Sequence, residues 1–157
     1  QVGSLVFGPL DRVFDTRKRI AATGSLLIAG VLAMLALWPN PPASVAMAAI
    51  VSIGFFSACS SMIMTHGRGT IPDRLIGRGM ATINTAVMLG VACMQSASGF
   101  IVGAFPRLPD GARPEDAYRT LFAVLTVVLV VAVGIYSRST DVKPSVEMRA
   151  AKAREMA

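Results

Sequence analysis

The chain has 157 residues, of which 54% are hydrophobic and only 15% are charged, and its mean hydropathy is +0.61. This composition is typical of a membrane protein and excludes an ordinary soluble domain. The formal net charge of +6 comes from basic residues that lie between long apolar segments, so it indicates membrane topology rather than binding to nucleic acid.

Residues 1–19 combine a short apolar stretch with a cluster of charges. Residues 1–10 are apolar but too few to cross a bilayer, and the chain begins with Gln rather than Met, so we expect the end of a truncated helix here. Asp11 and several cations follow a Gly-Pro turn. An aspartate at this position can pair with an arginine or accept hydrogen bonds at the start of another helix. The alternative is a solvated loop that only sets the topology.

Four apolar segments without Asp, Glu, Lys or Arg follow, at about residues 20–38, 43–65, 80–105 and 120–137. At about 1.5 Å per helical residue they reach roughly 27 to 39 Å, close to the roughly 30 Å of a bilayer hydrocarbon core. Lipid offers no hydrogen-bond partners to backbone amides, so each segment must be a helix. The sequence therefore predicts an all-α membrane protein with four transmembrane helices, spanning residues 20–137.

The four segments differ in polarity, and we expect them to differ in what they face. The first and fourth are almost entirely Ala, Leu, Ile and Val, which favours contact with lipid. The second and third carry the candidates for lining a cavity, which are Ser57, Ser61, Asn84, Met88 and Gln95. Asn84, Met88 and Gln95 share one helix face. Amides within a membrane need a partner or water, so hydrogen bonding between helices is the alternative role.

The basic residues alternate between the two sides of these segments. Residues 1–19, the connection between the second and third segments, and the tail at residues 138–157 hold 12 of the 15 Lys and Arg residues. The proline-rich connections at residues 39–42 and 106–114 lie on the other side. Since cytoplasmic loops carry an excess of basic residues, we expect the first side and the tail to be cytoplasmic.

The remaining candidate residues are interpreted as structural. Gly99 and Gly103 form a G-x-x-x-G pair, which predicts close helix packing. Cys59 and Cys93 lie inside apolar segments without ligand spacing, so we interpret them as packing residues. His66 is the only histidine and lies at the end of the second segment, where we expect an interfacial residue. The sequence shows no catalytic or phosphate-binding motif, so it predicts no metal, no cofactor and no enzyme activity.

The charged stretch near the start carries a family resemblance. Gly8, Leu10, Asp11, Arg12, Arg17 and Lys18 match in type and order the loop signature of the major facilitator superfamily, roughly Gly-x-Leu-x-Asp-Arg-x-Gly-Arg-Lys. Phe14 stands where the family usually has Gly, and Gly8 is three residues before Asp11 rather than four. Residues 71–81 resemble the family's Pro-x-x-x-x-Gly-Arg-Gly approach to helix eleven.

This resemblance implies a C-terminal portion of such a transporter, from the end of helix eight through helix twelve, as a partial C-terminal bundle. The implied function is secondary active transport of a small solute by alternating access, with Asp11 docked against N-terminal helices that are missing here. The other implied partner is membrane lipid, and the composition hints at a bacterial inner membrane. The alternative is a small four-helix membrane protein with a structural or assembly role.

Overall fold

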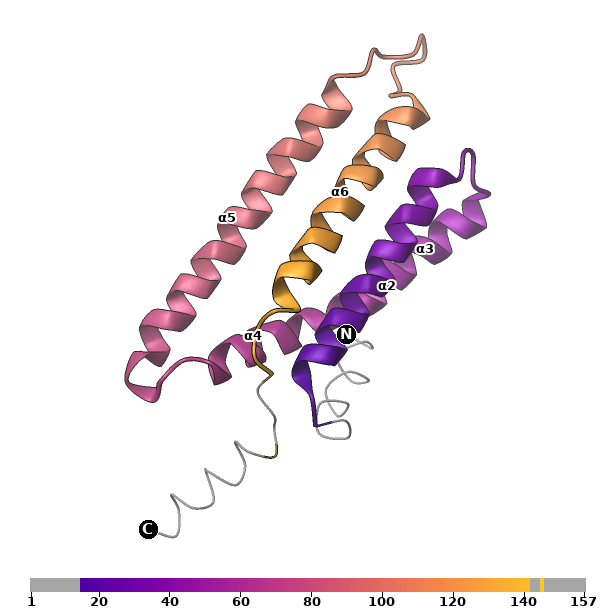
Figure 1. The fold of residues 1–157 in the computed structure, drawn as a ribbon. Helices are drawn as coiled ribbons and strands as arrows, with labels where there is room; N and C mark the ends of the chain where they lie inside the picture. Colours follow the sequence, from indigo (N-terminus) through magenta and orange to yellow (C-terminus); the bar gives the residue numbers. More distant parts are fainter. Residues whose placement is uncertain (1–14, 142–144, 146–157) are drawn as a thin grey trace, which may run out of the picture.

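The computed structural model describes residues 15–141 and Ser145, a helical part of the chain without strands. Its elements in chain order are α2 (Arg17–Leu37), α3 (Ala43–Phe56), the 3₁₀ turn η1 (Ser57–Cys59), α4 (Ser60–Gly69), the 3₁₀ turn η2 (Asp73–Leu75), α5 (Ile76–Gly103) and α6 (Glu115–Tyr136) (Figure 1). Four stretches are long and apolar enough to cross a membrane, namely Arg17–Leu37, Ala43–Gly69, Asp73–Gly103 and Glu115–Tyr136. The predicted all-α fold with four transmembrane helices is confirmed.

Three of these helices begin earlier than their apolar segments because their first turns contain charged residues. α2 begins at Arg17, after Thr16, whose hydroxyl accepts a hydrogen bond from the Arg19 amide over 3.3 Å. α6 begins at Glu115, directly after Pro114. A hydroxyl cap, and an acidic residue in the first turn, both favour the start of a helix. A prediction from hydropathy alone therefore begins these helices only after their charged first turns.

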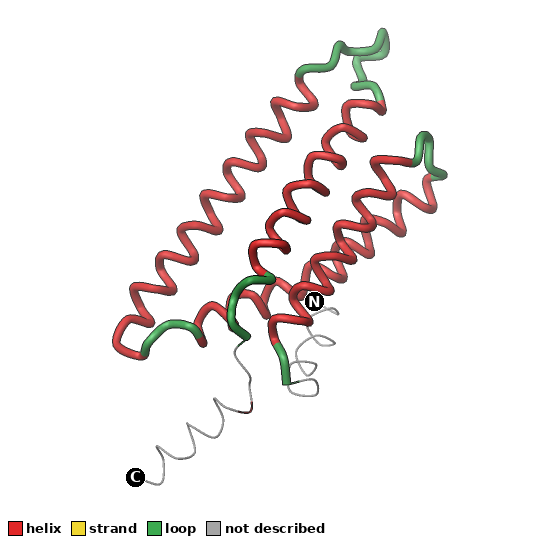
Figure 2. The backbone as a smooth tube through the Cα atoms, in the orientation of Figure 1, coloured by secondary structure: helices red, strands yellow, loops and turns green. Residues whose placement is uncertain are grey.

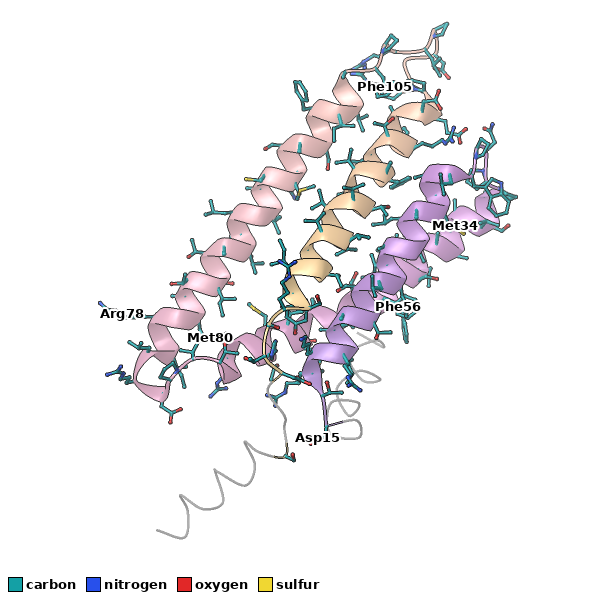
Figure 3. The ribbon with its side chains drawn as sticks, in the orientation of Figure 1. Asp15, Met34, Phe56, Arg78, Met80 and Phe105 are labelled. Carbon is teal, nitrogen blue, oxygen red and sulfur yellow. The ribbon has the colours of Figure 1, made fainter. Side chains whose placement is uncertain are left out.

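The spans alternate in direction between two ends of the molecule (Figure 2). We call residues 15–19, 66–78 and 136–141 the basic end, and residues 37–43 and 104–115 the proline end. α2 runs from the basic end to the proline end, α3 and α4 return, α5 runs forward again and α6 returns (Figure 1). At the proline end, Arg113 donates from Nη1 to the carbonyl of Phe105, which Figure 3 marks at the end of α5. Because the chain crosses between the two ends four times, the start of α2 and the end of α6 lie at the same end.

α2 is the central helix of the described part of the chain. It packs against α3, η1, α4 and α6, and its buried residues include Ala21, Ala29, Leu32 and Leu35. Leu26 and Leu27 on the same helix are 51% and 45% exposed, so the expectation that the first span faces lipid holds for only part of its surface. Alanine and glycine on α2 let neighbouring backbones approach closely, and part of the apolar composition therefore serves helix packing.

α6 packs along α2 but keeps an open outer side. The contact between α2 and α6 is the most extensive between any two helices of the described residues. On the other side of α6, the side chains of Val127, Val131 and Ile135 are more than half exposed. This outer face has the apolar composition that lipid contact requires.

The second span is bent. α3 continues through η1 into α4, which leaves the direction of α3 and crosses toward the start of α5 (Figures 1 and 2). Ser57 Oγ donates to the Ile53 carbonyl, and Ser61 Oγ donates to the Ala58 carbonyl, each over 2.6 Å. Hydroxyls bonded back to the preceding turn bend helices, and a 3₁₀ turn within a helix often marks a hinge.

The bend also lies close against α2. A Cβ atom on Gly24 would lie 2.7 Å from Cys59 Sγ and 2.9 Å from Cys59 Cβ. Real Cβ atoms do not tolerate such distances, so only glycine fits at position 24 without a shift of η1. Cys59 is 2% exposed, which fits the predicted packing role, whereas Cys93 is exposed and does not pack within the described fold, contrary to the same prediction.

Candidate functional site

The basic end joins the start of α2 to the segment after α6. Thr16 Oγ1 donates to Asp141 Oδ2 over 2.6 Å, and the Lys18 amide donates to Asp141 Oδ1 over 3.3 Å. Lys18 Nζ donates to the carbonyl of Ser139 over 2.6 Å. The carboxylate of Asp141 thus lies at a helix N-terminus and the Lys18 ammonium lies just beyond a helix C-terminus, and the helix dipoles favour both placements.

His66 joins α4 to the same segment. Its ring is 2% exposed, with Nε2 lying 2.8 Å from the Thr140 carbonyl oxygen and Nδ1 lying 2.7 Å from the Tyr136 hydroxyl. The ring stands edge-on to that of Tyr136, with centroids 5.4 Å apart and an interplanar angle of 87°. The only histidine is therefore a buried connector with both ring nitrogens bonded, rather than a residue exposed at an interface.

Asp15 adds a third connection at this end (Figure 3). Its carboxylate accepts hydrogen bonds from the Ser145 amide over 2.9 Å and from the Ser145 hydroxyl over 2.7 Å. The adjacent Arg17 is only 8% exposed. Polar groups that precede α2 and polar groups that follow α6 in the sequence therefore surround the start of α2. Together these contacts make the basic end a polar junction between three of the four spans.

The predicted motif lies only partly within the described residues. Gly8, Leu10, Asp11 and Arg12 fall outside them, whereas Arg17 and Lys18 form the first turn of α2. The interaction expected of Asp11, a carboxylate at the start of a helix, is made at α2 by Asp141. The docking of Asp11 itself stays a prediction.

The predicted cavity face of α5 is open. Asn84, Met88 and Gln95 are exposed, and no atom outside the helix's own backbone lies within 4 Å of a Cβ placed on Gly99 or Gly103. The close helix packing predicted for this glycine pair is therefore not made within the described residues. At about 100° per residue, these five residues form one continuous stripe along the helix. The partly covered residues of α5 lie on a different stripe, and they include Ile83, Met94, Ala97, Ser98 and Ile101. Neither amide makes a hydrogen bond to another described helix.

The structure does not bring the two groups of cavity candidates together. Ser57 and Ser61 are exposed at the bend of the second span, where their hydroxyls bond to their own helix. α5 runs apart from α3, with α6 between them (Figure 1). The two serines therefore influence the shape of the second span, and no residue of that span joins the polar stripe of α5.

The proline end holds a cavity of about 130 Å³ between α2, α3 and α6. Its walls are mainly apolar, with Leu35, Ile50 and Phe122 among the lining residues. The charged groups at its rim are engaged, because Glu115 Oε1 accepts from the Asn40 amide over 2.6 Å and Arg119 Nε donates to the Ala36 carbonyl over 3.0 Å. This cavity offers packing space without reactive groups.

The described residues contain no group of three or more His, Cys, Asp or Glu side chains that could hold a metal ion. Sequence reasoning assigned no role in the site to Asp15, Tyr136 or Asp141. The one available signal was that Asp141 is an isolated acid shortly after the fourth span, opposite a basic segment in the predicted topology.

The comparisons with known proteins identify the family of the chain. No curated protein and no solved structure gives a significant match. The sequence model of the Major Facilitator Superfamily, however, matches residues 1–155, nearly the whole chain. With four membrane-spanning helices of alternating direction and a polar junction at the basic end, the chain belongs to the major facilitator superfamily of membrane transporters.

Proposed function

We propose that the chain is part of a secondary active transporter that moves a small solute by alternating access. In this proposal it supplies the C-terminal portion of the fold, from the end of helix eight through helix twelve. The family match and the four spans support this assignment. In transporters of this kind two bundles rock about a site near the bilayer midplane, so the chain must present one polar helix face to that site.

The open polar stripe of α5 is the observation that carries the proposal. Polar amides at membrane depth are costly unless they are paired or hydrated, and Asn84 and Gln95 have no partner on another described helix. Lipid cannot cover this stripe favourably, whereas a water-filled solute pathway can. We therefore infer that Asn84, Met88 and Gln95 line the pathway, with Gly99 and Gly103 continuing the same face.

The proposal includes the partners and the orientation. The N-terminal helices of the same transporter would lie opposite the α5 stripe, and Asp11 would brace them at the basic end. Because 12 of the 15 basic residues lie on that side, the basic end and the tail would face the cytoplasm of a bacterial cell. Lipid would cover the outer face of α6.

Thiol modification combined with solute uptake tests this function. The longer transporter that contains this chain is reconstituted in liposomes as Cys93→Ala with Asn84→Cys or Gln95→Cys, and uptake is screened with a panel of radiolabelled small solutes. We expect saturable uptake of at least one solute that falls at least tenfold after treatment with a charged thiol reagent. The reagent needs a hydrated thiolate, which only the water-filled pathway provides.

The unmodified sequence supplies the control. Cys93 is exposed and lies on nearly the opposite side of α5 from Met88, so it should face away from the pathway and its treatment should leave uptake unchanged. Absence of uptake for every solute in the panel, or equal loss of uptake in the variants and the control, would contradict the proposal.

A further inference from the structure

The bend of the second span places α4 across the basic end, and α4 touches the rest of the described fold through a narrow face. Only Met62 and His66 of α4 are buried. These two residues are four positions apart and lie on one side of the helix. The opposite side, which includes Arg68, is exposed. α4 also packs against α2 and α5, and His66 adds hydrogen bonds from α4 to another span.

The carbonyl partner of His66 determines the tautomer of its neutral ring. A backbone carbonyl can only accept, so Nε2 must carry the proton that is donated to Thr140. In the neutral ring Nδ1 is then an acceptor, and the Tyr136 hydroxyl donates to it. The neutral ring with the proton on Nε2 satisfies both contacts at once. One side chain thereby ties α4 to the last residue of α6 and to the segment that follows.

The segment that His66 holds is itself attached to α2. Asp141, next to Thr140, accepts from Thr16 and Lys18, and Lys18 Nζ donates to Ser139. The partners of His66 are thus anchored to the most buried helix of the described fold. If its bond to Tyr136 is lost, the bond from His66 Nε2 to the Thr140 carbonyl alone ties the ring to this segment, while η1 retains the features of a hinge.

We propose that His66 is a latch that holds the second span in its bent form by tying α4 to the end of α6. When the His66–Tyr136 bond is broken, the bent form loses one of the two hydrogen bonds of His66, and a larger fraction of the molecules has α4 closer to the direction of α3. The latch is a positioning device that needs no bound solute. Its test is therefore separate from that of the transport function.

The test measures the length of the second span between two spin labels. Ser44→Cys and Arg68→Cys are introduced into the full 157-residue chain in lipid nanodiscs, with Cys59→Ser and Cys93→Ser to remove the native thiols. A straight helix would place these two positions about 36 Å apart, and a bent span must be shorter. We expect the main distance to lie several ångströms below that value in the parent chain. Tyr136→Phe, which removes one hydroxyl, should move a measurable fraction of the population toward the longer distance.

Two further variants complete the test. Tyr118→Phe removes the other tyrosine hydroxyl, which lies near the proline end of the same helix, and should leave the distance distribution unchanged. His66→Leu removes both hydrogen bonds and should give the largest shift; if this variant fails to fold, Tyr136→Phe decides alone. A parent distance near 36 Å, or equal distributions in the parent, Tyr136→Phe and Tyr118→Phe, would overturn the proposal.

Discussion

α2 and α5 are both long apolar helices, yet they occupy opposite extremes of the described fold. In the most apolar 18-residue window of α2, 33% of residues are buried, whereas none is buried in the corresponding window of α5. α2 has neighbours on several sides, while α5 packs against α4 and α6 along one stripe. The more polar helix of the two is thus the one that is left open.

This difference shows what hydropathy does and does not report in a membrane. An open apolar face contacts lipid without penalty, but an open polar face needs water or another protein segment. Apolar composition therefore does not separate a central helix from one that faces lipid. An open stripe with Asn84 and Gln95, in contrast, is a reason to expect function.

The largest effect is expected at the contact that makes α2 central. Gly24→Ala places a methyl group against Cys59, whose Cβ and Sγ lie within 3 Å of it, so either η1 or α2 must shift. We expect the free energy of unfolding to fall by about 1 to 3 kcal/mol. The measurement is denaturant-induced unfolding of the chain in detergent, followed by circular dichroism.

Gly30→Ala is the matched control for this substitution. Gly30 lies on the same helix, and no described atom lies within 4 Å of a Cβ placed on it, so its replacement should be neutral or stabilising by up to about 1 kcal/mol. Equal effects of the two alanines would show that α2 is not closely packed at the bend, and the contrast between α2 and α5 would lose its basis.

An intermediate effect is expected at the polar junction. Asp141→Ala removes the acceptor for Thr16 and for the Lys18 amide at the start of α2, and should lower the free energy of unfolding by about 1 kcal/mol. High salt should reduce the difference between this variant and the parent. Asp110→Ala serves as the comparison, since Asp110 accepts only from Ala112 within its own turn. If the free energy of unfolding falls no more than it does for Asp110→Ala, Asp141 does not stabilise the junction.

The smallest effect is expected on the open face of α5. Nothing among the described residues lies near Gly99, so Gly99→Ala in the 157-residue chain should raise the free energy of unfolding by up to about 1 kcal/mol through helix propensity alone. The measurement is the same unfolding titration. A destabilisation would show that this face is covered within the chain, and the assignment of α5 as the open helix would then fail.

The number of spans and their alternating direction were predictable because they depend on local composition. Four uncharged segments of sufficient length and the distribution of basic residues fix both. The first turns of α2 and α6 were not predictable from hydropathy, since charged residues at helix ends reach water and depend on caps such as Thr16. Sequence-based bounds therefore miss three to five residues at these starts.

The bend and the junction were not predictable because they depend on residues far apart in the chain. Gly24 meets Cys59, and His66 meets Tyr136, only once the helices have packed. The serines near residue 57 were predicted to line a cavity rather than to bend the span, and nothing in the sequence pairs His66 with the end of α6. The polar stripe of α5 was predictable from helical periodicity alone, whereas its exposure required the structure.

Hydrogen bonds link α2 and α6 at both ends of their contact. Arg119 donates to the Ala36 carbonyl at one extremity, and Thr16 donates to Asp141 at the other. A shift of α6 along α2 by one helical turn, about 5.4 Å, would break both hydrogen bonds at the same time. The two hydrogen bonds therefore fix the register of α6 along α2.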